Sequence, residues 1–419
     1  MGLSTELMRG YARIRELTGS LRAGEDLEVT GLSDTQLRHL CHVLLHETGK
    51  RGVYIAWNEM QARKAIDDFR HFLGDDAVFL PNREVMLYDV SARSFEQTHG
   101  RVQALERLLS GDCRLLVTSA EAILHPLTPP ERYRALSLTL EPGLSLPIED
   151  LAARLTEMGY EREEKVEGRG QYAVRGGILD LFAIGADLPC RIEFFDIEID
   201  SMRFFSPETQ RSVERAERLP VHPAREVLYA RDEVPAIAQR LRDDLERTLP
   251  KLPPEHRDSL RRNIGGYIDK LTDSHWFTGA DKFIPYMLPD AATLFDYVGE
   301  GSVVFLEDPT RATERMENER DDHFRLCETL MEKGMLLPGS YRLHHDPETL
   351  WAATARCHLV SFRPFDAPEA FSGGVSLCGR PLRALRIPGL TLAPYAGHLE
   401  LLSEDIHKWT ERGMRTVVL

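Results

Sequence analysis

The first 135 residues alternate short apolar runs with longer amphipathic stretches. Three runs have the length and composition of strands buried on both faces, residues 52–57, 77–80 and 114–120. Two stretches between them predict helices, one from Asn58, a favourable N-cap, through Leu73 and one over about 94–109. Strands that alternate with helices usually pair in parallel, so this part of the chain predicts an α/β unit.

Residues 168–223 follow a different pattern, with a period of two. Two apolar-rich runs, 172–184 and 191–205, are separated by a Gly/Asp/Pro cluster that predicts the loop of a β-hairpin or ribbon. The alternation gives the small sheet one apolar face and one face of interspersed charges, Arg175, Arg191, Arg203, Glu193, Asp196 and Asp200. Phe195 follows Phe194, and neighbouring side chains on a strand point to opposite faces, so one of the two rings is forced away from the core.

The remaining chain reads as further helices and strands after a proline-rich break at 126–130, which predicts a linker. Helices are expected at 148–158, 234–248, 253–271, 311–333 and 395–412, and strands at 138–140, 302–307, 358–362 and 415–419. The aromatic cluster of Trp276, Phe277, Phe283 and Tyr286 is interleaved with acids, which favours a core over a base-stacking platform. Residues 372–374 and 379–381 predict a flexible join.

Composition narrows the class of protein. A chain of 419 residues predicts two to four domains. Its formal net charge of -15 disfavours a protein that binds the phosphate backbone of nucleic acids non-specifically. The six cysteines form no CxxC pair, which argues for reduced thiols and against a structural zinc or a disulfide framework. No secretion signal or run of ~18 apolar residues occurs, so we expect a cytoplasmic protein with no membrane contact.

A nucleotide-binding version of the α/β unit would need a P-loop, with glycines that turn backbone amides toward phosphate, a Lys and a Ser/Thr. At the position where a P-loop would lie, residues 30–38 read TGLSDTQLR. Of the residues that a P-loop requires, only one glycine, Gly31, is present there. Leu37 and Arg38 stand roughly where Lys and Ser/Thr belong, so an ordinary helix capped by Ser33 or Asp34 is the favoured interpretation. A strand that ends in Glu307 and Asp308 resembles a magnesium-binding acidic motif, which we interpret as a relic. We predict no cofactor and no metal.

Residues 172–182 (YAVRGGILDLF) and 188–201 (LPCRIEFFDIEIDS) carry a long motif of fixed spacing. It resembles the module shared by the repair protein UvrB and the bacterial transcription-repair coupling factors (Mfd), and the flanking segments favour the latter family. UvrB has a long aromatic DNA-clamping hairpin, whereas residues 81–101 here leave little room for one and hold only Tyr88 and Phe95.

The resemblance implies a multidomain α/β fold. A degenerate RecA/P-loop-like α/β domain is split by a small, hairpin-rich α+β domain of the UvrA-binding type, and the start of a further small α/β domain follows. The expected divisions are 1–135, 136–222 (the UvrA-interaction domain), 223–366 (the second part of the UvrB-like module) and 367–419 (a linker and the start of the next domain).

The resemblance also implies a function, that of a non-enzymatic adaptor that recruits UvrA to stalled RNA polymerase in transcription-coupled repair. It assigns UvrA binding to Arg175, Arg191 and Phe195, and it assigns contacts with RNA polymerase and DNA, and ATP hydrolysis, to parts of the family protein that are absent here. The alternative is a UvrB-like damage-binding ATPase subunit, which Leu37 counts against. A generic hydrolase or nuclease that uses Glu307, Asp308 and histidines lacks any HxH or HExxH spacing.

Overall fold

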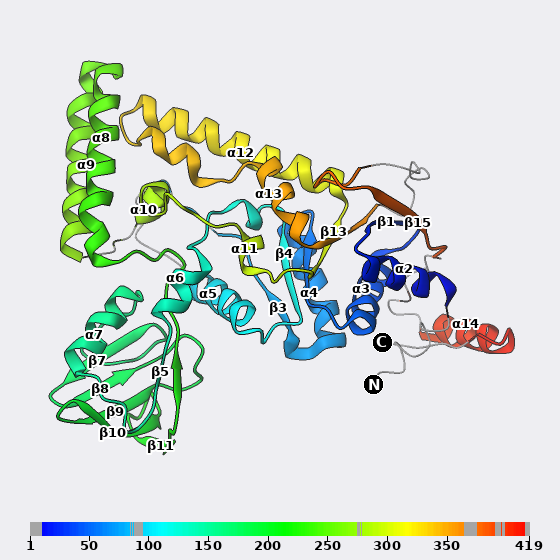
Figure 1. The fold of residues 1–419 in the computed structure, drawn as a ribbon, viewed down its shortest axis with the longest axis horizontal. Coiled ribbons are helices and arrows are strands. Elements are labelled where there is room, and N and C mark those ends of the chain that lie inside the picture. The colour runs from blue at the N-terminus through cyan, green and yellow to red at the C-terminus, as the bar shows by residue number, and fades with distance from the viewer. Residues whose placement is uncertain are drawn as a thin grey trace.

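The structure is a computed structural model that describes residues 11–83, 85, 87, 95–274, 277, 279–363, 375–389, 395 and 399–414. Figure 1 shows an α/β body built around a large sheet, a β-rich unit that projects from its lower left, and an upright helix pair at its upper left. The fold is therefore α/β with a parallel sheet and a separate β-rich sheet, in agreement with the coarse prediction.

The large sheet has seven parallel strands in the order β15-β1-β14-β13-β2-β4-β3. The strands span Asp26–Thr30 (β1), Gly52–Ala56 (β2), Ala77–Phe79 (β3), Leu115–Ser119 (β4), Val303–Glu307 (β13), His358–Phe362 (β14) and Leu382–Arg386 (β15). The central strands are buried on both faces, which explains their almost continuous apolar composition. The strands predicted at 52–57, 77–80, 114–120, 302–307 and 358–362 are confirmed.

Helices cover both faces of this sheet. The helices on one face pack into a core with Leu27, Tyr54 and Val117, and they are α2 (Ala12–Ala23), α3 (Asp34–Thr48) and α4 (Glu59–Leu73). The other face carries α5 (Phe95–Ser110), α11 (Leu294–Tyr297), α12 (Pro309–Glu332) and α13 (Pro347–Ala353). The predicted cap is confirmed, because the Asn58 side chain accepts a hydrogen bond of 2.8 Å from the Gln61 backbone N–H.

The β-rich unit is a six-stranded sheet in the order β11-β10-β9-β8-β7-β6, antiparallel except between β6 and β7. Its strands are Glu161–Arg162 (β6), Gln171–Arg175 (β7), Ile178–Leu181 (β8), Cys190–Phe195 (β9), Glu198–Phe205 (β10) and Ser212–Arg215 (β11). Helix α7 (Ile148–Glu157) packs on its apolar face. A two-stranded sheet of β5 (Leu138–Leu140) and β12 (Leu219–Val221) accompanies it, and α6 (Pro130–Leu136) precedes it.

The interpretation of 172–184 and 191–205 as two single strands is wrong in one respect. Each run is itself a hairpin. Gly176, with a φ of 60°, turns the chain between β7 and β8, and Asp196, with a φ of 56°, turns it between β9 and β10. The predicted pairing across residues 185–189 is confirmed as the β8–β9 ladder.

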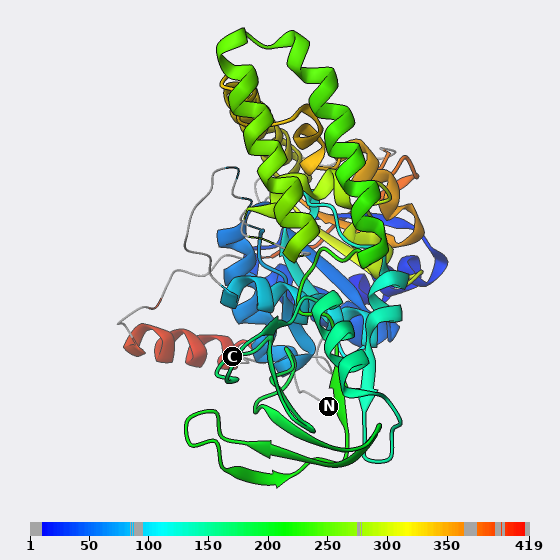
Figure 2. The same cartoon turned by 90° about the vertical axis from the view of Figure 1, so that its left-hand side faces the viewer.

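The upright helix pair consists of α8 (Val234–Thr248) and α9 (Pro254–Ser274), which Figure 2 shows standing above the β-rich unit. A third core unites these helices with α10 (Ile284–Met287) and part of α12. Phe283 and Tyr286 are buried in this core and Phe277 packs against it, as predicted, whereas Trp276 lies outside the described residues.

Part of the predicted flexible join is instead an anchored part of the sheet. Strand β15 pairs in parallel with β1 over five residues, and the Arg380 Nε donates to Asp26 Oδ2 at 3.0 Å. Asp26 is almost fully buried, so this ion pair fixes residue 380 to the sheet. Helix α14 (Leu399–Glu411) lies within the helix expected at 395–412, and the strand expected at 415–419 lies outside the described residues.

A buried ion cluster joins the β-rich unit to the α/β body. The Glu226 carboxylate accepts hydrogen bonds of 2.6 and 2.8 Å from Arg101 on α5 and one of 3.2 Å from Arg83 Nε. All three side chains are buried. The proline-rich break lies beside this cluster and is also packed, since the Thr128 hydroxyl donates to the Glu226 carbonyl oxygen at 2.6 Å.

Candidate functional site

The tip of the β9–β10 hairpin exposes an aromatic side chain. Phe195 is 79% exposed and ends β9, whereas Phe194 packs against the core of the β-rich unit. The prediction that one of the two rings leaves the core is therefore confirmed, and the exposed ring is Phe195. Ile197, in the turn, is also exposed, and sequence reasoning missed it. The tip consequently presents two neighbouring apolar side chains to solvent.

Arg191 and Arg175 lie on the same face of this sheet as Phe195. Arg191 and Phe195 are an even number of residues apart on β9, which places them on one face. Arg175 lies opposite Ile178, and Ile178 lies opposite Glu193, which extends the same face across β7 and β8. The three residues predicted from the motif thus share one face, although they stand on two different hairpins.

Both arginines bind one buried carboxylate, that of Asp180. Arg191 Nε and Nη2 donate to Asp180 at 2.7 and 2.8 Å, and Arg175 Nη2 donates to it at 2.8 Å. The hydrogen bond and charge of Asp180 raise the pKa of Arg191 against the opposing effect of burial. Sequence reasoning missed Asp180, although it is the polar residue of an otherwise apolar run, because only the β8–β9 register places it opposite Arg191.

The shared carboxylate holds the two guanidiniums in place without using all their donors. Each guanidinium has five N–H groups, and the bonds to Asp180 occupy one on Arg175 and two on Arg191. Arg191 also lies over the Phe205 ring at 4.9 Å, which restricts it further. The Arg175 side chain remains 54% exposed. The face therefore offers ordered cationic groups and, further along the same face, an exposed aromatic ring.

The loop that corresponds to a P-loop is covered by the chain itself. Gly31, with a φ of 88°, follows β1, and its carbonyl oxygen accepts a hydrogen bond of 2.9 Å from the Gly389 N–H. The Ile387 N–H donates to the Thr30 carbonyl oxygen at 3.0 Å. A Cβ added at Gly31 would lie 2.4 Å from the Ile387 carbonyl oxygen. The segment after β15 thus occupies the space directly above this loop.

The N-terminus of α3 is also satisfied internally. Ser33 and Gln36 form a capping box, as the interpretation of an ordinary capped helix requires. Leu37 is buried in the core. Arg38 is buried too, and its Nη1 contacts Asp68 Oδ2 at 2.6 Å. Neither side chain points into an open phosphate site of the kind that a P-loop forms at a helix N-terminus.

The two carboxylates at the end of β13 are likewise engaged. The Glu307 carboxylate accepts a hydrogen bond of 2.7 Å from the Tyr54 hydroxyl, which lowers its pKa. Burial has the larger effect and raises the pKa of Glu307. Asp308, with a φ of 45°, caps α12 by accepting from the Arg311 N–H at 3.2 Å. Within the described ranges, no cluster of three or more His, Cys, Asp or Glu side chains has the geometry of a metal site.

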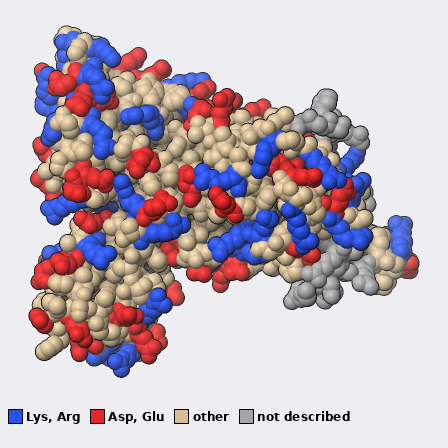
Figure 3. Space-filling view, in the orientation of Figure 1, with Lys and Arg blue, Asp and Glu red and all other residues tan. Residues whose placement is uncertain are grey.

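Two other expectations bear on nucleic acid and membrane. Residues 84, 86 and 88–94 fall outside the described residues, so the segment in which UvrB carries its hairpin is described only in part. Basic and acidic side chains are interspersed over the face of the molecule in Figure 3. Among the helices that the structure describes, none combines the length and the apolar character needed to span a bilayer.

Comparison with known proteins places these observations in a family context. The family model described as "UvrB interaction domain" matches residues 138–227, which cover the β-rich unit from β5 to the buried Glu226. A transcription-repair-coupling factor of Bacillus subtilis (strain 168) is 29% identical over 311 residues, which are 74% of this chain and 26% of that protein. One of Staphylococcus aureus (strain USA300) is 26% identical over 326 residues, 77% of this chain and 28% of that protein.

The chain therefore spans about a quarter of the length of the curated relatives it matches. The matches are consistent with the N-terminal UvrB-like region that the motif predicted. This chain carries a UvrB interaction domain and is, over about three quarters of its length, a homologue of the transcription-repair coupling factors.

Proposed function

We propose that this chain is an adaptor that docks the repair protein UvrA on the β-rich unit, through Arg175, Arg191 and Phe195. The observation that carries the proposal is the exposed Phe195 ring on the same sheet face as two guanidiniums held by Asp180. An aromatic ring and arginines are the residues most enriched at interface hot spots. Guanidiniums that are already ordered lose little freedom on binding a partner's carboxylates, which favours affinity.

Docking of UvrA would serve transcription-coupled nucleotide excision repair, in which the coupling factor recruits UvrA to stalled RNA polymerase. In this proposal the contacts with RNA polymerase and DNA, and the translocase activity, belong to parts of the family protein beyond the homologous quarter. The divisions at 1–135, 136–222, 223–366 and 367–419 are also part of the proposal. The strands β13 and β14 would then complete a sheet begun by the first segment.

The proposal includes that this chain does not bind or hydrolyse ATP, so Gly31, Leu37, Arg38, Glu307 and Asp308 form a degenerate nucleotide site. Two observations support this. The Gly31 loop is covered by residues 387–389, and Arg38 and Glu307 are bound to Asp68 and Tyr54 inside the body. The same observations count against the UvrB-like ATPase alternative.

Phe195→Ala is the sharpest test of UvrA docking. The ring is largely exposed, so its removal changes folding stability little, whereas loss of a hot-spot residue costs on the order of 2 kcal/mol, about thirtyfold in affinity. We expect at least that loss in a titration of UvrA, with an unchanged melting temperature. Arg191→Ala is a poorer test, because it leaves buried Asp180 with one partner and lowers stability as well.

Two matched controls lie on the same unit, one on its edge strand and one on the opposite side of its sheet. Val213→Ala removes an exposed apolar side chain from the edge strand β11, and Arg154→Ala removes an arginine from α7, on the opposite side of the sheet. Both should leave UvrA affinity within twofold. Normal UvrA binding by Phe195→Ala, or an equal loss in the controls, would show that this face is not the docking site.

A further inference from the structure

The outer edge of the seven-stranded sheet is open at β3. Among the described residues, strand β3 is last in the strand order and pairs with β4 alone. The Leu80 N–H donates to the Val117 carbonyl oxygen at 2.9 Å, so residues 78 and 80 direct their backbone groups to β4 and residues 77 and 79 direct theirs outward. The Ala77 N–H is used within a local turn. The Ala77 carbonyl and both backbone groups of Phe79 therefore face the open side.

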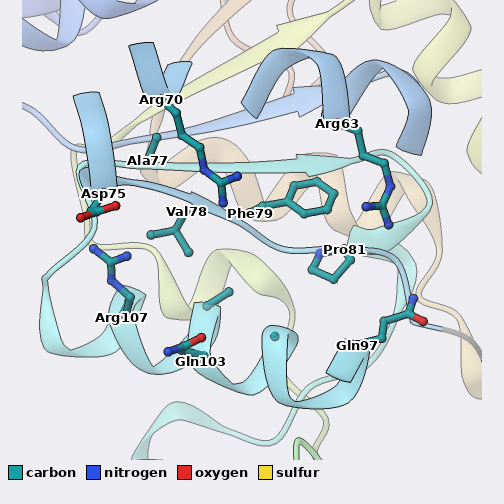
Figure 4. Close-up of a pocket in the computed structure, with 12 residues that line it drawn as sticks. Arg63, Arg70, Asp75, Ala77, Val78, Phe79, Pro81, Gln97, Gln103 and Arg107 are labelled. Atoms are coloured by element: carbon teal, nitrogen blue, oxygen red, sulfur yellow. The ribbon is translucent and has the colours of Figure 1, made fainter. Parts of the chain in front are cut away.

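A groove of about 510 Å³ runs along this edge. Figure 4 shows β3 and Pro81 between two helices, with α4 contributing Arg63 and Arg70 from one face of the sheet and α5 contributing Gln103 and Arg107 from the other. Strand backbone forms the floor and long polar side chains form both walls. A cavity of this size is in the range that holds a ligand or a short peptide segment.

The walls of the groove are basic, although the whole chain is acidic. Three arginines line the groove against one acid, Asp75. Arg63 Nη2 forms an ion pair with Glu59 Oε1 at 2.8 Å, and Arg107 Nη2 donates to the Asp112 carbonyl oxygen. The Arg70 side chain has no hydrogen-bond or ion-pair partner among the described residues, and in Figure 4 its guanidinium points toward Val78 and Phe79. The groove therefore has net positive charge and one uncommitted guanidinium.

We propose that this groove binds an extended acidic peptide segment of another protein, which adds to β3 as a further strand. Outward backbone donors and acceptors on an edge strand are complementary to another peptide backbone, and a nucleic acid offers no such ladder. The arginines then select carboxylates. This binding site is separate from the UvrA-docking face and does not depend on that assignment.

The spacing of Arg63 and Arg70 predicts the positions of the acidic residues along the bound peptide. Arg63 and Arg70 are two turns apart, ~10.5 Å along α4. In an added strand, side chains on one face repeat every ~6.6 Å, so acids two or four residues apart reach both arginines through their flexible stems. The residues between them face α5 and Arg107. A short segment with acids at alternate positions fits the wall on α4.

The test is fluorescence anisotropy with a labelled eight-residue peptide in which Glu and Val alternate. We expect the double variant Arg63→Glu/Arg70→Glu to bind the peptide at least tenfold more weakly, because both charge-assisted contacts on the α4 wall become repulsive. The control Lys64→Glu reverses one charge at an exposed position of α4 that does not line the groove, and should change affinity less than twofold. Equal melting temperatures would show that the variants fold.

A second probe separates strand addition from simple charge attraction. The same peptide with alternate backbone nitrogens methylated keeps its charges and loses its ladder donors, so we expect at least tenfold weaker binding. Three results would overturn the proposal: equal affinity of the double variant, equal affinity of the methylated peptide, or displacement of the peptide by duplex DNA at lower concentration than by unlabelled peptide. Self-association abolished by Arg63→Glu/Arg70→Glu in sedimentation would instead assign the edge to a second copy of this chain.

Discussion

The buried Glu226 carboxylate should be one of the strongest single contributors to stability at neutral pH. Burial alone would raise its pKa, but the charges of Arg101 and Arg83 outweigh burial and lower the pKa from 4.5 to about 2. At ~1.36 kcal/mol for each pKa unit, this difference corresponds to ~3 kcal/mol in favour of the ionised folded form. Removing one partner of a buried ion pair costs ~3–5 kcal/mol, a similar magnitude.

Glu226→Gln is the informative change, because glutamine has the shape of the protonated acid and leaves both arginines in place. We expect the variant to be less stable than the wild type by about 3 kcal/mol at pH 7, measured by urea unfolding followed by tryptophan fluorescence. Because the folded pKa is depressed, this stability is present above pH 4.5 and is lost as pH falls toward 2. The two proteins should therefore converge in stability at low pH.

The matched control is Glu217→Gln, an exposed position in the same unit, which should stay within ~0.5 kcal/mol of the wild type at every pH. Other carboxylates titrate equally in all three proteins, so their effects cancel in the differences. A gap below ~1 kcal/mol at pH 7, or a full gap that persists at pH 2, would refute the assignment of this stability to the Glu226 charge.

Two further predictions concern nucleotide binding at the Gly31 loop and the protonation of the buried His344. Calorimetry with ATP and magnesium should detect no binding, because residues 387–389 cover the Gly31 loop; micromolar affinity that Glu307→Gln abolishes would contradict this. Burial, with His323 and Arg320 nearby, lowers the pKa of His344 to about 3. As pH falls, His344 is therefore protonated in the unfolded chain before it is protonated in the folded protein. The free energy of unfolding should decrease as pH drops from 6.5 toward 3, and His344→Gln should weaken that pH dependence in the same urea assay.

Local patterns predicted much of this fold, since they depend on neighbouring residues. The two-residue period placed the strands around Arg191 and forced one phenylalanine out of the core, and apolar runs with an Asn cap placed β2 and α4. Residues 172–184 were interpreted as one run because apolar residues continue on both sides of Gly176, although two glycines allow a tight turn there. A short turn of two glycines resembles an interruption within one strand when only composition is considered.

Contacts between distant segments could not be predicted in the same way. Asp180 joins Arg191 only through the β8–β9 register, and Arg380 reaches Asp26 across most of the chain. Strand β15 was not predicted, because it directly follows Gly379 and Pro381 of the expected join, whereas its partner is the first strand of the sheet. The cover over Gly31 depends on the same long-range pairing, so the sequence predicted a lost nucleotide motif without indicating what fills its place.

The strand order of the large sheet has a consequence for biosynthesis. Strand β1 emerges early from the ribosome, yet its neighbours β14 and β15 are more than 300 residues downstream. All strands of the β-rich unit lie between residues 161 and 215, so this unit can fold while three of the seven strands of the large sheet are still unmade. During that interval both backbone edges of β1 are unpaired, and we expect nascent-chain chaperones to be most needed then.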